Sequence, residues 1–246
     1  MKLTLPAAHL FRHYMLFVIT VLCLLTFGRA AYALWKFVEL EQTGAFVPLF
    51  VQGLRFDLAL IGLVCLIPIF IGSLLSMFAI TRGLSKFIIT LFLYGALLAI
   101  LLLELVTPWF IHTVGVRPDP AMLLALPESV DNLVALVKEQ WIVAALMSVL
   151  FLLVLVAFWR RMELQRFLRY RTSIVAGILC SIVGTVLCLL AIWSNPDPRK
   201  LPLGPADALI SVDTTVNELA LNSTYKMLHS VALPFFNSLS DTAEKP

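Results

Sequence analysis

Four ionisable residues lie within or beside long apolar stretches of this 246-residue sequence: Arg29, Arg55, Asp57 and Glu104. A charge is costly in the hydrocarbon of a membrane, so an ionisable residue in such a position is by default a hypothesis of function. Two of the four are positive and two are negative. Because arginine binds carboxylate and phosphate equally well, the group has two interpretations. It either binds the phosphate-bearing headgroup of a lipid, or its charges neutralise one another and fix the packing of helices.

The composition indicates which elements must position these residues. Hydrophobic residues make up 61% of the sequence and charged residues only 13%, about half of the roughly 25% that is usual in soluble domains. The mean hydropathy is +0.96. These values exclude a disordered chain, a nucleic-acid-binding domain and an ordinary soluble enzyme. We therefore expect an all-α polytopic membrane protein, with its four cysteines as small buried apolar residues.

Five apolar stretches are long enough to cross a bilayer, which takes about 20 residues. They cover residues 14–35, 58–80, 87–111, 141–159 and 173–193. Trp35, Trp141, Trp159 and Trp193 lie at span edges, as is typical of side chains that meet the headgroups. The first stretch also resembles a signal peptide, with Ala31-Tyr32-Ala33 as a cleavage site. Its greater length favours an uncleaved anchor.

The basic residues predict the orientation of these spans. Nine of them fall in the N-terminal segment and in the second-to-third and fourth-to-fifth connections, against three in the two opposite connections. Since basic residues gather on the cytoplasmic side, the N-terminus is expected in the cytoplasm. Five spans then place the C-terminus outside the cytoplasmic membrane.

The four charges are expected at similar depth, in the outer leaflet. At about 1.5 Å per residue, Arg29 lies roughly 9 Å inward of Trp35, and Glu104 roughly 10 Å inward of Ile111. Arg55 and Asp57 immediately precede the apolar run 58–80 and should point to different sides of a helix. We expect Arg29 to pair with Glu104 or with Asp57.

The outer connection at 112–140 contains a stiff turn and an amphipathic helix. Pro118-Asp119-Pro120 restricts the backbone, and residues 128–138 follow with an apolar stripe at helical spacing. Such a helix lies in the outer membrane interface or packs on its neighbours, and the sequence favours neither.

Beyond the membrane domain at 1–194, the tail at 195–246 begins with a proline-rich, semi-rigid exit. Residues 206–233 then read as one amphipathic helix that ends before Pro234. Its apolar stripe contains Leu209, Val212, Val216 and Leu219. We expect this segment to be an extracytoplasmic linker.

No pattern of catalytic, cofactor-binding or metal-binding residues is visible. His-Glu-x-x-His, the Walker loop, Cys-x-x-Cys and Gly-x-Ser-x-Gly are all absent from the sequence. The basic residues at 160–171 are better explained by topology and by anionic lipid than by nucleic acid.

Gly53-Leu54-Arg55-Phe56-Asp57, at the start of the second span, resembles the membrane region of the lipoteichoic acid synthase family. That family contains phosphoglycerol and phosphoethanolamine transferases with a sulfatase-like extracellular domain. The tail 216–222, with Tyr225 soon after, is similar to the family's linker. The matching motif residues are Gly53, Arg55 and Asp57.

The resemblance implies a transferase whose catalytic domain follows the linker and carries a threonine nucleophile with a divalent metal, Mn or Mg. No family nucleophile or metal ligand maps onto these 246 residues, so we expect the catalytic domain to lie outside them. The chain would then anchor that domain in a bacterial inner membrane and present an anionic phospholipid of the outer leaflet to it. The alternative is a stand-alone membrane interaction or assembly subunit without enzyme activity. A small transporter or flippase ranks last, because the inner halves of the spans carry almost no charge.

Overall fold

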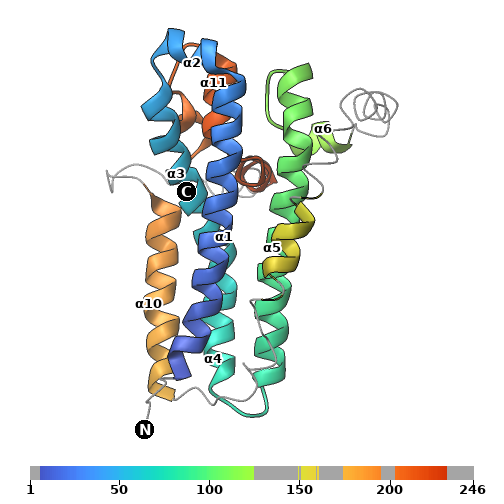
Figure 1. Cartoon of the computed structure of the whole chain (residues 1–246). Coiled ribbons are helices and arrows are strands. Elements are labelled where there is room, and N and C mark those ends of the chain that lie inside the picture. The colour runs from blue at the N-terminus through green and yellow to red at the C-terminus, as the bar shows by residue number, and fades with distance from the viewer. Residues whose placement is uncertain are drawn as a thin grey trace, which may run out of the picture. The chain divides into compact units, whose positions relative to one another are not determined.

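A computed structural model describes residues 6–124, 149, 151–158, 160, 174–194 and 203–231. All regular structure in these residues is helical (Figure 1). The chain forms two compact units. Unit 1 comprises Met1–Phe27, Asp57–Ala99 and Leu152–Leu203, and unit 2 comprises Gly28–Phe56, Ile100–Phe151 and Gly204–Pro246. Three long helices, α1, α3 and α5, contribute residues to both units.

The order of the elements follows the chain from the N-terminus. They are α1 (Pro6–Trp35), α2 (Phe37–Thr43), α3 (Phe46–Ile67), the π-helical turn η1 (Pro68–Gly72), α4 (Ser73–Ser76), α5 (Arg82–Thr113), α6 (Pro120–Leu124), α10 (Ile174–Trp193), the 3-10 turn η3 (Pro205–Ala208) and α11 (Thr214–Ala220). Residues 151–158 and 223–231 are also helical.

Within the part of the chain that the structure describes, four helical segments are long and apolar enough to cross a membrane: Phe11–Trp35, Phe46–Ser76, Arg82–Thr113 and Ile174–Trp193. They correspond to four of the five spans expected from the sequence, so the protein is a membrane-embedded helical protein. The remaining expected span, 141–159, lies mostly outside the described residues, although 151–158 are helical. The expected helix at 128–138, the basic stretch at 161–171 and the prolines at 196–202 also lie outside them.

The second span begins earlier than the sequence analysis expected. Helix α3 starts at Phe46, so Arg55 and Asp57 lie inside a helix and do not precede one. Pro48 falls in the first turn, where a proline removes no helical hydrogen bond. The apolar residues Leu49 and Phe56 are fully buried and extend the helix past its most hydrophobic part. Hydropathy alone missed this portion because polar residues interrupt it.

Unit 1 is organised around the π-helical turn η1. Pro68 cannot donate a backbone hydrogen bond, and carbonyl groups of this turn accept hydrogen bonds from hydroxyls on other helices. The Tyr14 hydroxyl donates to the Pro68 carbonyl at 2.7 Å, and the Ser85 hydroxyl donates to the Gly72 carbonyl at 2.7 Å. The Ser181 hydroxyl donates to the Phe70 carbonyl at 3.3 Å. Hydroxyls from α1, α5 and α10 thus satisfy three carbonyls of one turn, a common way to accommodate proline in a membrane.

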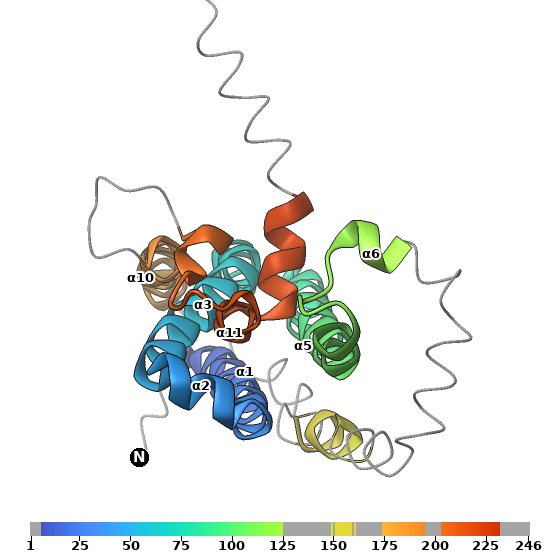
Figure 2. The same ribbon diagram turned by 90° about the horizontal axis from the view of Figure 1, so that it is seen from above.

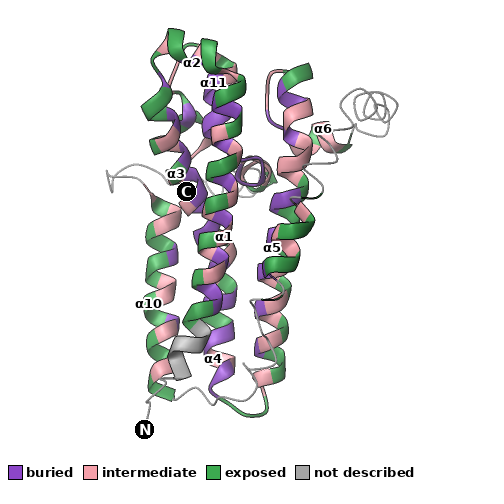
Figure 3. Cartoon of the chain, viewed as in Figure 1, coloured by how far each residue is buried: buried purple, intermediate pink, exposed green. Residues whose placement is uncertain are grey.

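Helix α10 packs closely on α3 and η1 because glycines remove side chains from the contact. A Cβ atom on Gly62 would lie 2.6 Å from the Cys188 carbonyl oxygen, and one on Gly184 would lie 2.4 Å from Cγ2 of Ile69. Small residues allow such approach between membrane helices. The other faces of α10 carry mostly exposed or half-buried apolar side chains (Figure 3), as expected of a helix in contact with lipid.

Unit 2 contains the tail segment 204–231, which is not the single helix expected at 206–233. It forms η3, α11 and the helix at 223–231, with breaks at 209–213 and 221–222. Seen from above, α11 lies beside α3 (Figure 2). Of the four residues in the expected apolar stripe, Val216 and Leu219 are buried, whereas Leu209 is 72% exposed and Val212 is fully exposed.

Local capping explains these breaks. The Asp213 carboxylate accepts hydrogen bonds from the backbone of Thr215 and Val216 and so begins α11. The Asn222 side chain accepts a bond from the Tyr225 backbone at 2.7 Å and begins the next helix. Side chains of this type favour helix starts over helix interiors, so the apolar stripe could not continue through them.

Candidate functional site: a buried charge network in unit 2

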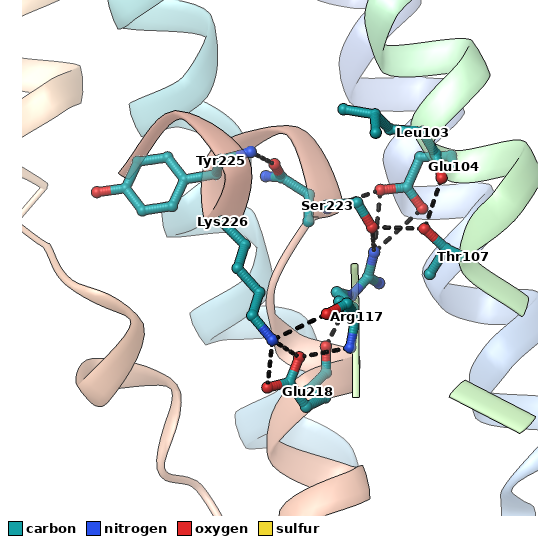
Figure 4. Close-up of polar contacts among 9 residues, drawn as sticks. Leu103, Glu104, Thr107, Arg117, Glu218, Ser223, Tyr225 and Lys226 are labelled. Carbon is teal, nitrogen blue, oxygen red and sulfur yellow. Dashed lines mark hydrogen bonds and ion pairs between the residues drawn. The ribbon is translucent and has the colours of Figure 1, made fainter. Parts of the chain in front are cut away.

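Arg117, just after α5, is the centre of a polar network (Figure 4). Its Nη1 donates to both carboxylate oxygens of Glu104, at 3.0 and 3.2 Å, and to the Ser223 hydroxyl at 2.9 Å. The Ser223 backbone N–H donates to the Glu104 carboxylate at 3.0 Å. The hydroxyls of Thr107 and Ser223 are also hydrogen-bonded to each other. Ser223 therefore ties the start of the helix at 223–231 to Glu104 and Thr107 of α5 by hydrogen bonds, and the Glu104–Arg117 ion pair joins α5 to the segment that follows it.

The other side of Arg117 binds α11 and the helix that follows it. Arg117 Nε donates to the Glu218 carbonyl at 2.7 Å, and the Arg117 backbone N–H donates to the Glu218 carboxylate at 3.0 Å. Lys226 Nζ donates to both oxygens of that carboxylate at 2.9 Å and to the Arg117 carbonyl at 3.0 Å. Two acidic and two basic side chains thus alternate through the network, and their charges balance.

Burial makes this network energetically important. The Arg117 side chain is only 2% exposed, and its guanidinium lies over the Tyr32 ring, 5.4 Å from the centroid. Burial by itself lowers the pKa of Arg117, but the charge of Glu104 and its other anionic neighbours outweighs burial and raises the pKa above its ordinary value. Arg117 therefore stays charged, and its cost of burial is offset only while both carboxylates remain in place.

The turn after α5 gives Arg117 its position. Gly115 has φ +79°, a left-handed conformation that glycine adopts without strain. Pro118 follows, and the Asp119 carboxylate accepts a bond from the Met122 backbone at 2.8 Å to begin α6. The stiff turn expected at Pro118-Asp119-Pro120 therefore immediately follows Arg117 and restrains it.

The four ionisable residues selected from the sequence have different environments. Glu104 is bound by Arg117, a partner that the sequence analysis had not considered. Asp57 is completely buried, whereas Arg55 is half-buried, as expected for residues on different sides of α3. Arg55 donates to the Gln52 side chain at 2.7 Å.

Arg29 lies against the backbone of Gly53. A Cβ atom at Gly53 would be 2.1 Å from Arg29 Nε and 2.2 Å from its Cζ. The Arg29 side chain is buried, with the residue 3% exposed. The glycine of the Gly-x-Arg-Phe-Asp motif thus makes room for a guanidinium from α1.

Sequence reasoning missed Arg117, Glu218, Ser223 and Lys226. These residues lie in polar segments where charge is ordinary, and Arg117 is separated from Glu218 by about a hundred residues of chain. The one available signal was the stiff turn beside Arg117. Among the described residues, no group of three or more His, Cys, Asp or Glu side chains could hold a metal ion.

Chemically, the network is suited to hold the tail segment 204–231 against α5 and the residues after it, because its charged groups bond to one another, to the Ser223 hydroxyl and to the backbone. No family model matches the chain, and no solved structure matches it.

Proposed function

We propose that the chain is the membrane-embedded part of a phosphoglycerol- or phosphoethanolamine-type transferase that acts on the outer face of a bacterial cytoplasmic membrane. The observation that carries this proposal is the buried network around Arg117. It joins the segment 204–231 to the end of α5 that is remote from the basic residues Arg82 and Lys86. A segment held in this way would set the height and direction of an extracytoplasmic catalytic domain that follows it.

The lengths of the helices support a site at the outer surface. Helices α1 and α5 contain 30 and 32 residues, about 45 and 48 Å, whereas the hydrocarbon core is about 30 Å thick. Counted from Arg12 and from Lys86, Arg29 and Glu104 lie about 26 and 27 Å along their helices. In a membrane-spanning arrangement with those basic residues inside, both would lie near the outer edge of the core.

In this proposal the charged residues have different roles, because their environments differ. Glu104 serves the network, and Arg29 is buried against Gly53. Of the two arginines among them, Arg29 is buried and Arg55 is half-buried. Arg55 is therefore the residue that would bind the phosphate of a donor lipid, while Gly53 and Arg29 fix the helix that carries it. Binding of this kind contributes orientation and not bond cleavage.

The test begins with the product of the native host, purified through an N-terminal tag. The expected product is heavier than the 27.4 kDa of this chain and transfers a labelled headgroup from phospholipid to an acceptor. A product of 27.4 kDa without a co-purifying transferase would contradict the proposal and favour a membrane interaction subunit.

Two variants of that product test the role of the membrane part. Arg55→Ala and Arg117→Ala should each reduce turnover of the lipid substrate and leave turnover of a soluble substrate unchanged. Exposed Glu41→Gln is the matched control and should change neither. Equal loss on both substrates would show that these residues maintain the fold and not the presentation of lipid.

A further inference from the structure

Two basic side chains lie at the start of α5, in unit 1. Arg82 is the first residue of this helix and Lys86 lies one turn further on, so the two are neighbours on one face. Like charges at this spacing repel each other. Among the described residues of unit 1, the one acidic residue is Asp57, which is fully buried in α3. The repulsion at the start of α5 is therefore not offset by an acidic side chain nearby.

Arg82 also contains a donor without an acceptor. The residue is half-buried, and its Nε atom is buried with no hydrogen-bond partner in the described structure. Lys86 is half-buried as well. A buried N–H group that makes no hydrogen bond is costly, so the Arg82 guanidinium is suited to an acceptor from outside the chain.

The backbone at the start of α5 favours a negative charge for a separate reason. The first turn contains no acidic residue, and the hydroxyl of Thr81, just before the helix, donates to the Leu75 carbonyl at 2.6 Å. The N-terminus of a helix carries a partial positive charge from its backbone N–H groups. An anion bound by Arg82 and Lys86 would gain from this partial charge too.

Exposed apolar side chains in the same stretch of chain indicate what kind of anion fits. In the connection between α4 and α5, Ile80 is 98% exposed and Phe78 is 58% exposed (Figure 3). In the first two turns of α5, Leu84 and Phe87 are 51% and 61% exposed. A free phosphate ion would leave these side chains in water. A phospholipid offers a phosphate to the cations and acyl chains to the apolar side chains.

We propose that Arg82 and Lys86 bind the headgroup of an anionic phospholipid at the start of α5. Arginine presents a fork of donors to the phosphate, and the lysine ammonium adds a second positive charge beside it. The lipid belongs to the leaflet at this end of the helix, which is the inner leaflet in the proposed orientation. The inference goes beyond the proposed function and is independent of it, because that function rests on the opposite end of α5.

The experiment measures lipid bound to the purified full chain by native mass spectrometry. The protein is offered equal amounts of phosphatidylglycerol, phosphatidylethanolamine and phosphatidylcholine with identical acyl chains. Each basic residue beside an anionic lipid contributes about fivefold, so the wild-type chain should prefer phosphatidylglycerol about 25-fold over the other two lipids. Equal retention of the three lipids would overturn the inference.

Charge-removing variants assign the preference to these two residues. Arg82→Gln and Lys86→Gln should each reduce the preference to about fivefold, and the double variant should abolish it while phosphatidylcholine binding persists. Arg82→Lys keeps the charge and should keep most of the preference. Lys36→Gln removes a cation from unit 2 and is the matched control, with no change expected. A full preference in the double variant, with an unchanged melting temperature, would refute the site.

A soluble competitor separates a lipid site from a site for a free anion. Glycerophosphate, the headgroup of phosphatidylglycerol without its acyl chains, should not displace the lipid at equal concentration, because it lacks the apolar contacts. Displacement would overturn the lipid assignment. Ile80→Ser should weaken the binding of phosphatidylglycerol without changing the effect of glycerophosphate. Unaltered lipid binding in Ile80→Ser and Phe78→Ser together would contradict a role for the exposed apolar side chains.

Discussion

The Arg29 guanidinium and the Gly53 backbone are in direct contact, so that any side chain at position 53 would occupy the space of Arg29. Such close approach explains why a motif with charged residues begins with a glycine. Glycine in a helix costs up to about 1 kcal/mol relative to alanine, and here the buried arginine offsets that cost.

Gly53→Ala should therefore destabilise the protein, since the buried Arg29 side chain has little room to move away. Gly28→Ala is the matched control, because nothing lies within 4 Å of a Cβ atom at that helical position. Melting temperatures in detergent should fall for Gly53→Ala and stay equal or rise for Gly28→Ala. The same behaviour in both variants would mean that Arg29 can rearrange freely.

Arg117→Met should destabilise unit 2 by about 3–5 kcal/mol, the usual cost of leaving a buried charge without its partner. The substitution leaves Glu104 without its charged partner and removes the bond that Arg117 Nε donates to the Glu218 carbonyl. Chemical denaturation checks the magnitude, and limited proteolysis should show faster cleavage within 204–231. Combining Arg117→Met with Glu104→Gln should recover part of the loss, because the unpaired charge is then removed.

The exposed ion pair of Lys36 and Glu39 provides the control for the Arg117 variants. Its side chains are 27% and 39% exposed, and pairs of this kind contribute about 0–1 kcal/mol. Lys36→Met should therefore have little effect on unfolding. A loss of stability in Lys36→Met as large as that in Arg117→Met would contradict the conclusion that burial makes the Arg117 ion pair important for stability.

Gly62→Ala should separate α10 from α3, because the new Cβ atom would meet the backbone carbonyl of Cys188 at 2.6 Å and a backbone cannot rotate away. Gly95→Ala in α5 is the control, with no atom within 4 Å. Cross-linking of cysteine pairs introduced across α3 and α10 should decline only in Gly62→Ala. Unchanged cross-linking would show that the two helices tolerate a wider separation.

The pKa of His229 predicts a dependence of stability on pH. Because burial lowers this pKa from its ordinary 6.5, the folded protein binds the proton less readily than the unfolded chain does. Stability should be greatest above about pH 6.5 and should fall as the pH decreases through that value. His229→Gln should remove this part of the pH dependence in thermal melts from pH 5 to pH 8. An identical profile in the variant would assign the effect to other groups.

Hydropathy predicted the existence of four helices, because a spanning helix needs a long apolar run and α10 matches its expected range within one residue. It did not predict that α3 begins at Phe46, since Gln52, Arg55 and Asp57 lower the local hydropathy. Burial by neighbouring segments, which a sequence profile does not contain, allows these residues to remain helical.

The candidate site was less predictable than the fold. Glu104 was found because its position in an apolar run is unusual, but Arg117 has an ordinary position in a polar turn. Its partners are Glu104, Glu218, Ser223 and Lys226, and the last three lie about a hundred residues away. No local pattern encodes such a contact, and the capping by Asp213 and Asn222 overrode the apolar periodicity of the tail.

The hydrogen bonds around η1 have a consequence for the register of the membrane helices. Tyr14, Ser85 and Ser181 each reach one carbonyl of a single turn. Sliding α1, α5 or α10 by one residue would move its hydroxyl by about 1.5 Å and turn it by about 100°, out of reach of that carbonyl. Apolar faces alone tolerate such a slip. The π-helical turn therefore fixes the axial position of each of these three helices, and with it how far each helix extends across the membrane.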